Sequence, residues 1–315
     1  MIINRSHIPW AILTMGATIV LAAIYLQEFR PGLIPYHLPV PDSLAARPYG
    51  HRSVGATPLG MWYGSAAFAI FLFAAMLGGR KKVRHWRIGR AETWMRAHIW
   101  LSILSIPLVL FHCGFHSGSA MTTGLLILYA LVMVSGFYGL ALQQFIPRQM
   151  MTRLTHEVIF DQIPYLRGKL VEDAKRLREE LRISGGRDSG GGVAVAVAED
   201  PRTVEARQAV RELLEAEVMP YLQSRSGLFA RKGARRRLGS PQVAAHLFHM
   251  VRLGAGERYE ERVDEMERWC EQRRQMDYQE VMQHWLHYWL LVHVPASLLL
   301  LIWTAWHAVT GLFYF

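Results

Sequence analysis

Cysteine is almost absent from this 315-residue chain, which contains only Cys113 and Cys270. An iron–sulfur cluster is held by about four cysteine thiolates, and covalent c-type haem needs a C-x-x-C-H motif. Zinc ribbons also depend on cysteine pairs. Two isolated cysteines exclude all three kinds of site. A metal cofactor held by this chain alone must therefore use other ligands.

Nucleotide-binding signatures are also missing. No G-x-G-x-x-G dinucleotide fingerprint occurs anywhere in the chain. The glycine-rich segment SGGRDSGGG at 184–192 lacks the G-K-[ST] ending of a phosphate-binding loop and follows no predicted strand. Its composition is typical of a flexible linker. We therefore expect no flavin or nicotinamide site in this chain.

Charge and hydrophobicity are segregated along the sequence. Hydrophobic residues make up 51% of the chain, and its net charge is +10. The arginines cluster beside apolar segments, where membrane topology already accounts for them. This distribution predicts membrane spans with one polar insert and argues against nucleic acid as a partner.

Five segments are apolar and long enough to cross the ~30 Å hydrocarbon core of a bilayer. For the first segment a signal peptide is the alternative, but the run is longer than a usual signal core and no A-x-A site follows, so we expect a retained span. The sequence thus predicts an all-α, polytopic membrane helix bundle of about five spans. The expected spans are Ile8–Leu26, Pro58–Gly79, Arg96–His116, Thr122–Phe145 (ended by Pro147) and a last one from Trp285 to Phe315.

A polar, largely helical insert separates spans four and five. Amphipathic patterns predict helices at Lys169–Ile183 and Val204–Leu222, and a charged helix at Arg258–His284. We expect the insert to dock a neighbouring subunit, because its apolar stripes need cover; a self-contained helical domain is the alternative. The expected regions are 1–147 with spans one to four, 148–284 as the insert, and 285–315 as the fifth span.

Positive charge predicts the orientation in the membrane. Seven cationic residues lie in or beside the loop after the second span: Arg80, Lys81, Lys82, Arg84, Arg87, Arg90 and Arg96. The connector after the third span, GFHSGSAMTT, has none. The positive-inside rule then places the amino terminus and the insert in the cytoplasm and Phe315 on the outer side of the cell (inner) membrane. Spans three and five therefore run in the same direction.

Spans three and five each carry two histidines at the same spacing. His98 and His112 are fourteen residues apart, and so are His293 and His307. Fourteen residues is just short of four turns, so both imidazoles of a pair share one helix face and lie about 21 Å apart along the axis. On parallel helices, His98 meets His293 near the cytoplasmic side, and His112 meets His307 near the outer side. Histidine inside a span is costly and usually functional, so four at matched spacing favour haem ligation over packing.

Haem bound at these histidines must be b-type, because the cysteines of a covalent attachment are missing. Neutral imidazole is a good iron ligand, and its second nitrogen needs a hydrogen-bond partner. Pro107 and Pro295 each remove a backbone N–H. We expect the carbonyls that they free on the ligand helices to serve as these partners.

His116 is the alternative outer ligand, because it lies eighteen residues after His98 on nearly the same face. Gly114 indicates that the helix is ending before His116. We therefore favour His112.

This pattern resembles the membrane di-haem cytochrome b superfamily, and most of all the ferric-reductase/NADPH-oxidase-like transmembrane domains; cytochrome b subunits of quinol-linked complexes are similar at this level. In those families, paired histidines on the third and fifth spans hold two stacked haems. The resemblance implies that His98, His112, His293 and His307 ligate the iron of two b-type haems. It covers the spans, about half of the chain. The insert and the lack of a flavin or nicotinamide domain after the last span depart from it.

The resemblance implies an electron-transfer subunit of a membrane oxidoreductase complex rather than a self-sufficient enzyme. Electrons would pass between a cytoplasmic or quinol donor or acceptor and an outer-side partner such as cytochrome c or a similar carrier. Expected partners are the other subunits of the complex, with quinone as a candidate ligand. The alternative is a non-redox membrane scaffold whose cytoplasmic insert recruits partners.

The orientation can be tested by proteolysis. Because the positive-inside rule places the insert in the cytoplasm, a protease added to spheroplasts should spare residues 148–284 and cut them only in inverted vesicles. Immunodetection of the fragments reports the result. Cleavage from the outside would reverse the orientation and exchange the inner and outer levels.

Overall fold

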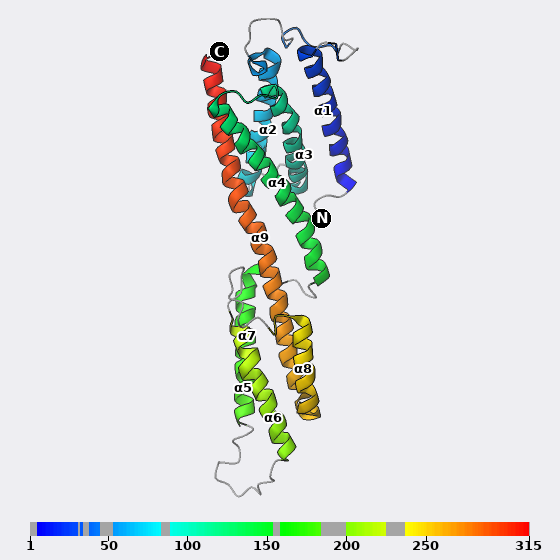
Figure 1. The fold of residues 1–315 in the computed structure, drawn as a ribbon, viewed down its shortest axis with the longest axis vertical. Helices are drawn as coiled ribbons and strands as arrows, with labels where there is room; N and C mark the ends of the chain where they lie inside the picture. Colours follow the sequence, from blue (N-terminus) through cyan, green and yellow to red (C-terminus); the bar gives the residue numbers. More distant parts are fainter. Residues whose placement is uncertain are drawn as a thin grey trace. The chain divides into compact units, whose positions relative to one another are not determined.

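All the secondary structure that the computed structural model describes is helical (Figure 1). The described residues are 5–30, 32–33, 38–44, 53–82, 89–153, 158–183, 200–224 and 237–314. The chain divides into two compact units, one formed by 1–145 together with 286–315, and the other by 146–285. The arginine-rich part of the second loop and the glycine-rich segment 184–192 lie outside the described residues.

Five described helices are long and apolar enough to cross a membrane. Within the first unit, α3 packs against α2 and α1. Figure 1 shows α3 and the carboxy-terminal part of α9 running in the same direction. The five helices are α1 (Ile8–Phe29), α2 (Pro58–Lys82), α3 (Ala91–Cys113), α4 (Ala120–Arg153) and α9 (Glu257–Tyr314).

Local chemistry explains where α2 and α3 begin and end. Pro58 starts α2, and the Thr57 hydroxyl accepts the N–H of Gly60 at 3.0 Å, which caps the helix. Gly114 ends α3 with a left-handed φ of 60°, and its N–H reaches the carbonyl of Leu110. The end of α3 at Cys113 places His112 inside the helix and His116 beyond it.

Two expected helix boundaries were wrong. The fourth helix does not end at Pro147 but continues to Arg153, because a proline removes one hydrogen bond and can bend a helix without ending it. The charged helix expected at Arg258–His284 and the last span form a single helix of 58 residues, α9. No glycine or capping residue interrupts it around Trp285, so the change from charged to apolar side chains leaves the backbone pattern intact.

The second unit has a hydrophobic core of its own. Its helices are α5 (Ile163–Ile183), α6 (Pro201–Leu213), a π-helical turn (Leu214–Val218), α7 (Met219–Gln223), α8 (Pro241–Ala255) and the first part of α9. Val210, Phe248, Val263 and Met266 are completely buried in this core. The helix α8 was not expected from the sequence. The predicted docking of the insert to a neighbouring subunit stays a prediction, and so does the alternative of a self-contained domain.

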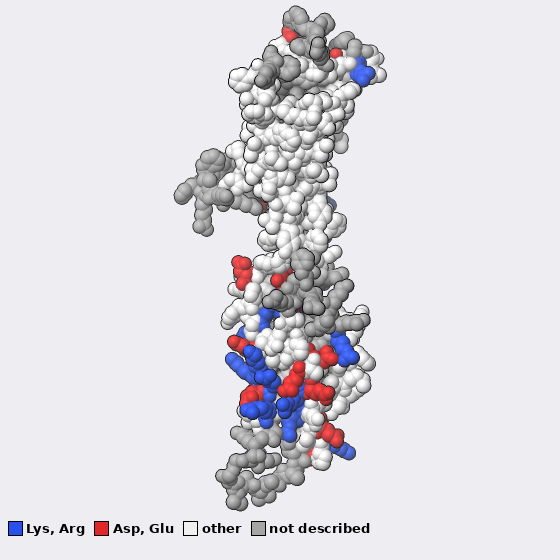
Figure 2. Space-filling view, turned by 60° about the vertical axis from the view of Figure 1, so that its left-hand side comes forward, with Lys and Arg blue, Asp and Glu red and all other residues white. Residues whose placement is uncertain are grey.

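Charged side chains lie on the surface of the insert. On the face that Figure 2 shows, lysines, arginines, aspartates and glutamates gather there. Arg273 is only 2% exposed; its guanidinium donates to the carbonyls of Leu222 (3.1 Å) and Ser224 (2.6 Å) at the end of α7. Asp277 lies 3.1 Å from the same guanidinium. These partners offset the cost of burying the charge.

The buried thiol of Cys270 gives a direct test of the insert core. Burial raises the pKa of this thiol to about 12, so it should resist alkylation until the core opens. Phe248→Ala removes a fully buried ring and should cost about 3–5 kcal/mol, raising the alkylation rate of Cys270 by two or more powers of ten. Mass spectrometry of the Cys270 peptide measures the rate.

The matched control is Met250→Ala, which changes an exposed side chain on the same helix and should leave the rate nearly unchanged. Equal rates in the Phe248→Ala variant and the unaltered protein would contradict the assignment of this core.

Candidate functional site

The four spaced histidines lie in the first unit, at two levels of the bundle. His98 and His112 are on α3, and His293 and His307 are on α9. All four are partly buried. The structure thus places one histidine of each helix at each level, as the matched spacing predicted for parallel helices.

His112 and His307, called the outer pair after the predicted orientation, are close enough for their two rings to share one metal ion. The ring centroids of His112 and His307 are 6.2 Å apart, and the ring planes are inclined by 75°. Two imidazoles that ligate one iron from opposite sides have centroids roughly 6 Å apart, because each metal–nitrogen bond is about 2 Å and each nitrogen lies about 1 Å from its centroid. The angle between the planes is not fixed, because each ring can turn about its own metal–nitrogen bond. The outer pair therefore fits bis-histidine ligation.

The hydrogen bond of His112 fixes which nitrogen is available to a metal. Its Nδ1 lies 2.8 Å from the carbonyl oxygen of Gly60 on α2. A carbonyl only accepts, so Nδ1 must carry the proton and Nε2 keeps its lone pair. A Cβ at Gly64 would lie 2.7 Å from this same Nδ1. Glycine at position 64 is therefore what lets the imidazole rest against α2.

The second level, called inner after the predicted orientation, contains His98 on α3 and His293 on α9, and both side chains are partly buried. The Nδ1 atom of His293 lies 3.2 Å from the hydroxyl of Ser135 on α4. The Trp289 indole stacks on the His293 ring at 5.2 Å and donates its N–H to the Ser135 carbonyl at 2.7 Å. One residue of α4 thus contacts both the histidine and its neighbouring tryptophan.

The Nδ1 atoms of His98 and His307 are buried and have no hydrogen-bond partner among the residues that the structure describes. A histidine that only packs in a core normally has its buried nitrogens satisfied. Each level therefore combines one ring that is held by a protein hydrogen bond with one that is not. A group bound at Nε2 would leave both of these Nδ1 atoms without a partner.

A buried layer separates the two levels. Ser105 lies seven residues from both His98 and His112, and Leu300 lies seven residues from both ligand candidates on α9. The Ser105 hydroxyl donates to the Ser102 carbonyl at 2.6 Å, so it accepts from the Tyr129 hydroxyl at 2.9 Å. Tyr129 and Leu300 belong to one hydrophobic cluster. The hydroxyl groups of Ser105 and Tyr129, which lie between the two levels, thus hydrogen-bond to each other.

The proline-freed carbonyls are not the partners of His112 and His293. His112 uses Gly60 and His293 uses Ser135, both on neighbouring helices. His116 is exposed beyond the end of α3, and its Nδ1 contacts the carbonyl of Gly114. The geometry therefore favours His112 over His116 as the outer ligand candidate.

The sequence did not identify Gly60, Ser135 or Trp289 as site residues. The indole of Trp289 donates a hydrogen bond to the carbonyl of Ser135 on α4. The glycines of α4 were a usable signal: a Cβ at Gly139 would overlap the Trp289 ring, and one at Gly136 would lie 3.5 Å from His293.

No group of three or more His, Cys, Asp or Glu side chains forms a metal site among the described residues. Haem differs from such sites because the porphyrin supplies four ligands and the protein needs to add only one or two. A haem site therefore needs only one or two histidines from the protein and does not require a group of three ligands.

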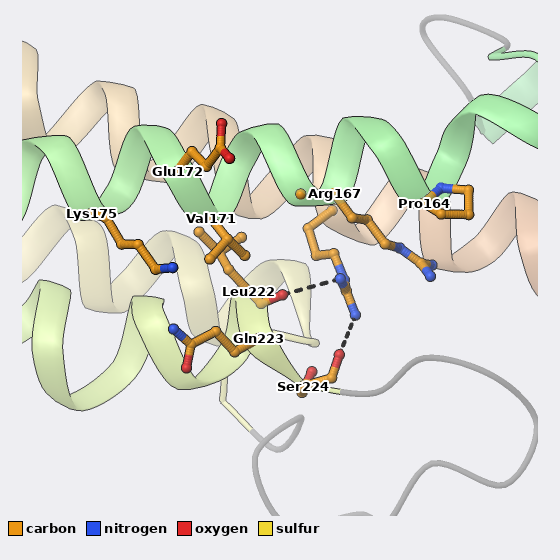
Figure 3. Close-up of a pocket in the computed structure, with 10 residues that line it drawn as sticks. Pro164, Arg167, Val171, Glu172, Lys175, Leu222, Gln223 and Ser224 are labelled. Carbon is orange, nitrogen blue, oxygen red and sulfur yellow. Dashed lines mark hydrogen bonds between the residues drawn. The ribbon is translucent and has the colours of Figure 1, made fainter.

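The insert contains a groove of about 630 Å³ between α5 and the end of α7 (Figure 3). Two arginines line it, but Arg167 pairs with Asp277 and Glu280, and Arg273 binds backbone carbonyls. The two guanidiniums serve the packing of the insert, and we assign this groove no ligand.

Comparisons with protein-family models, with curated proteins and with solved structures find no match for this chain. The support for the candidate site therefore comes from its geometry and not from a known relative.

Gly64→Ala tests the fit of the site at His112. The added methyl group would crowd the His112 ring, so a haem that His112 ligates would be lost and a haem at the level of His98 and His293 would be retained. Gly78→Ala is the matched control, because a Cβ at this position of the same helix meets nothing within 4 Å. The ratio of haem to protein measures the effect. Two haems in both variants would contradict the placement of His112 against α2.

Proposed function

We propose that this chain is a di-haem b-type cytochrome subunit that transfers electrons across a membrane. The observation that carries the proposal is the pair His112–His307, whose 6.2 Å centroid separation fits ligation of one iron. A second histidine pair, His98 and His293, lies on the same two helices and supports the proposal. Haem would supply a one-electron ferric–ferrous couple at each level.

The residues around the histidines hold the rings and exclude water. The Gly60 carbonyl keeps the proton of His112 on Nδ1, so its Nε2 can bind iron. Ser135 and Trp289 hold the ring of His293. Tyr129 and Leu300 fill the layer between the levels. The fourteen-residue spacing separates the levels by about 21 Å along the helices, which divides one crossing of the hydrocarbon core into shorter steps.

The donor and the acceptor belong to other molecules in this proposal. The chain works in a cell (inner) membrane with the insert on the cytoplasmic side, between a cytoplasmic or quinol partner and an outer-side carrier such as a cytochrome c. Other subunits of a redox complex would supply the remaining chemistry. The purified chain should accordingly not oxidise NAD(P)H by itself.

The second candidate is a non-redox membrane scaffold. The observation in its favour is that the insert has its own hydrophobic core and could bind partners without any cofactor. Reduced-minus-oxidised absorbance distinguishes the two. A b-type spectrum with two haems per chain supports the cytochrome, and a colourless protein supports the scaffold.

Replacing a single histidine should remove one haem. Loss of His112 or His307 leaves the outer iron with one protein ligand, so His112→Ala and His307→Ala should reduce the content from two haems per chain to about one. His98→Ala and His293→Ala should remove the other haem. Pyridine-haemochrome analysis of the purified variants measures the content.

His116→Ala is the control for this series, because His116 is exposed and lies outside the helix. It should retain two haems. If His116→Ala lost one haem and His112→Ala kept both, the outer ligand would be His116.

A further inference from the structure

We propose that Ser135 of α4 is a positioning residue for the inner ligand His293, and that its hydroxyl sets the redox balance of the inner haem alone. The inference deepens the proposed function and rests on it. It names a residue that touches neither the outer level nor its ligands in the contacts described above. Three observations carry it: the two bonds of Ser135, the glycines beside it, and the different partner at the outer level.

Ser135 contacts the inner level through both its main chain and its side chain. Its carbonyl accepts the indole N–H of Trp289 at 2.7 Å, and its hydroxyl lies 3.2 Å from Nδ1 of His293. Trp289 and His293 are four residues apart on α9, so they lie on one face of the helix. The backbone bond positions the tryptophan, and the hydroxyl reaches the histidine.

Glycine makes these contacts possible. The Trp289 ring lies against the backbone of α4 at Gly139, where a Cβ would overlap the indole carbons. The indole also stacks on the His293 ring with an interplanar angle of 26°. The His293 ring lies 3.5 Å from the position that a Cβ of Gly136 would take. The tryptophan therefore contacts both α4 and the histidine, and these contacts restrict the orientation of the imidazole.

The two levels differ in the partner of their hydrogen-bonded ring. The outer ligand His112 donates to a backbone carbonyl, that of Gly60, at 2.8 Å. The inner ligand His293 has a side-chain hydroxyl at 3.2 Å. If Nε2 of His293 bound iron, Nδ1 would carry the proton and would donate a hydrogen bond to the Ser135 oxygen. This hydrogen bond would make the imidazole a stronger electron donor and would favour ferric over ferrous iron.

The test separates this hydrogen bond from the positioning. Ser135→Ala removes the hydroxyl but keeps the carbonyl that holds Trp289. We expect both haems to stay bound, and the ferrous-to-ferric ratio of the inner haem at a fixed potential to rise roughly two- to tenfold. Ser135→Thr keeps a hydroxyl and should restore the ratio. Redox titration followed by visible absorbance gives these values, first in the full protein and then in the His112→Ala background, where only the inner haem contributes.

Ser297→Ala is the matched control. Its hydroxyl lies one turn from His293 on α9 but donates to the backbone carbonyl of His293 at 2.7 Å and not to the ring. It should leave both haems unchanged. Gly139→Ala tests the positioning part: displacement of Trp289 should lower inner-haem occupancy or alter its low-spin resonance signal, and Gly311→Ala, with nothing within 4 Å of its Cβ, should do neither.

The outcomes are decisive for the role of Ser135. An unchanged inner ratio in Ser135→Ala, an equal change in both haems, or loss of both haems overturns the inference and leaves the cytochrome proposal standing. A protein that binds no haem before any substitution overturns the cytochrome proposal itself.

Discussion

The structure of the first unit depends on the cost of holding histidine nitrogens within an apolar helix bundle. An unpaired polar group in such a setting costs several kcal/mol, so its neighbours must either satisfy it or leave it to a ligand. Gly60 and Ser135 each satisfy one nitrogen. Gly64 and Gly139 serve the same requirement, because a larger side chain at either position would displace His112 or Trp289.

Helical periodicity connects the two levels to the layer between them. A fourteen-residue interval returns to nearly the same face, and so does half of it, because seven residues are close to two turns. The histidine interval therefore places Ser105 on α3 and Leu300 on α9 at mid-height. Both are buried. A single periodic face on each helix thus carries two ligand candidates and the residue that separates them.

The features that could be predicted from the sequence are those that depend on hydropathy, charge and spacing along the chain. Length, hydropathy and the charge difference between two loops indicated the spans, and the spacing indicated that His112 would lie beside His307, where the structure has it. The fusion of the charged helix with the last span, the helix α8 and the partners of the histidine rings were missed. The partners of the rings depend on which neighbour fills a space, and a sequence pattern does not encode this. The other two features had local signals, because no glycine or capping residue interrupts α9 around Trp285 and Ser240 followed by Pro241 marks the start of α8. Proline-freed carbonyls were the plausible local partners, but nearer acceptors on α2 and α4 took that role.

The kind of partner at each level limits how the site can be altered. The carbonyl of Gly60 belongs to the main chain, so no substitution removes it and only a shift of α2 changes its contact with His112. The hydroxyl of Ser135 belongs to a side chain, and one substitution removes it while the backbone bond to Trp289 remains. The two levels share the histidine pairs and their spacing, yet the hydrogen bond of His293 can be removed by changing a single residue. In a bundle that must keep its helix spacing, a side-chain partner is the less disruptive way to make two otherwise matched sites differ.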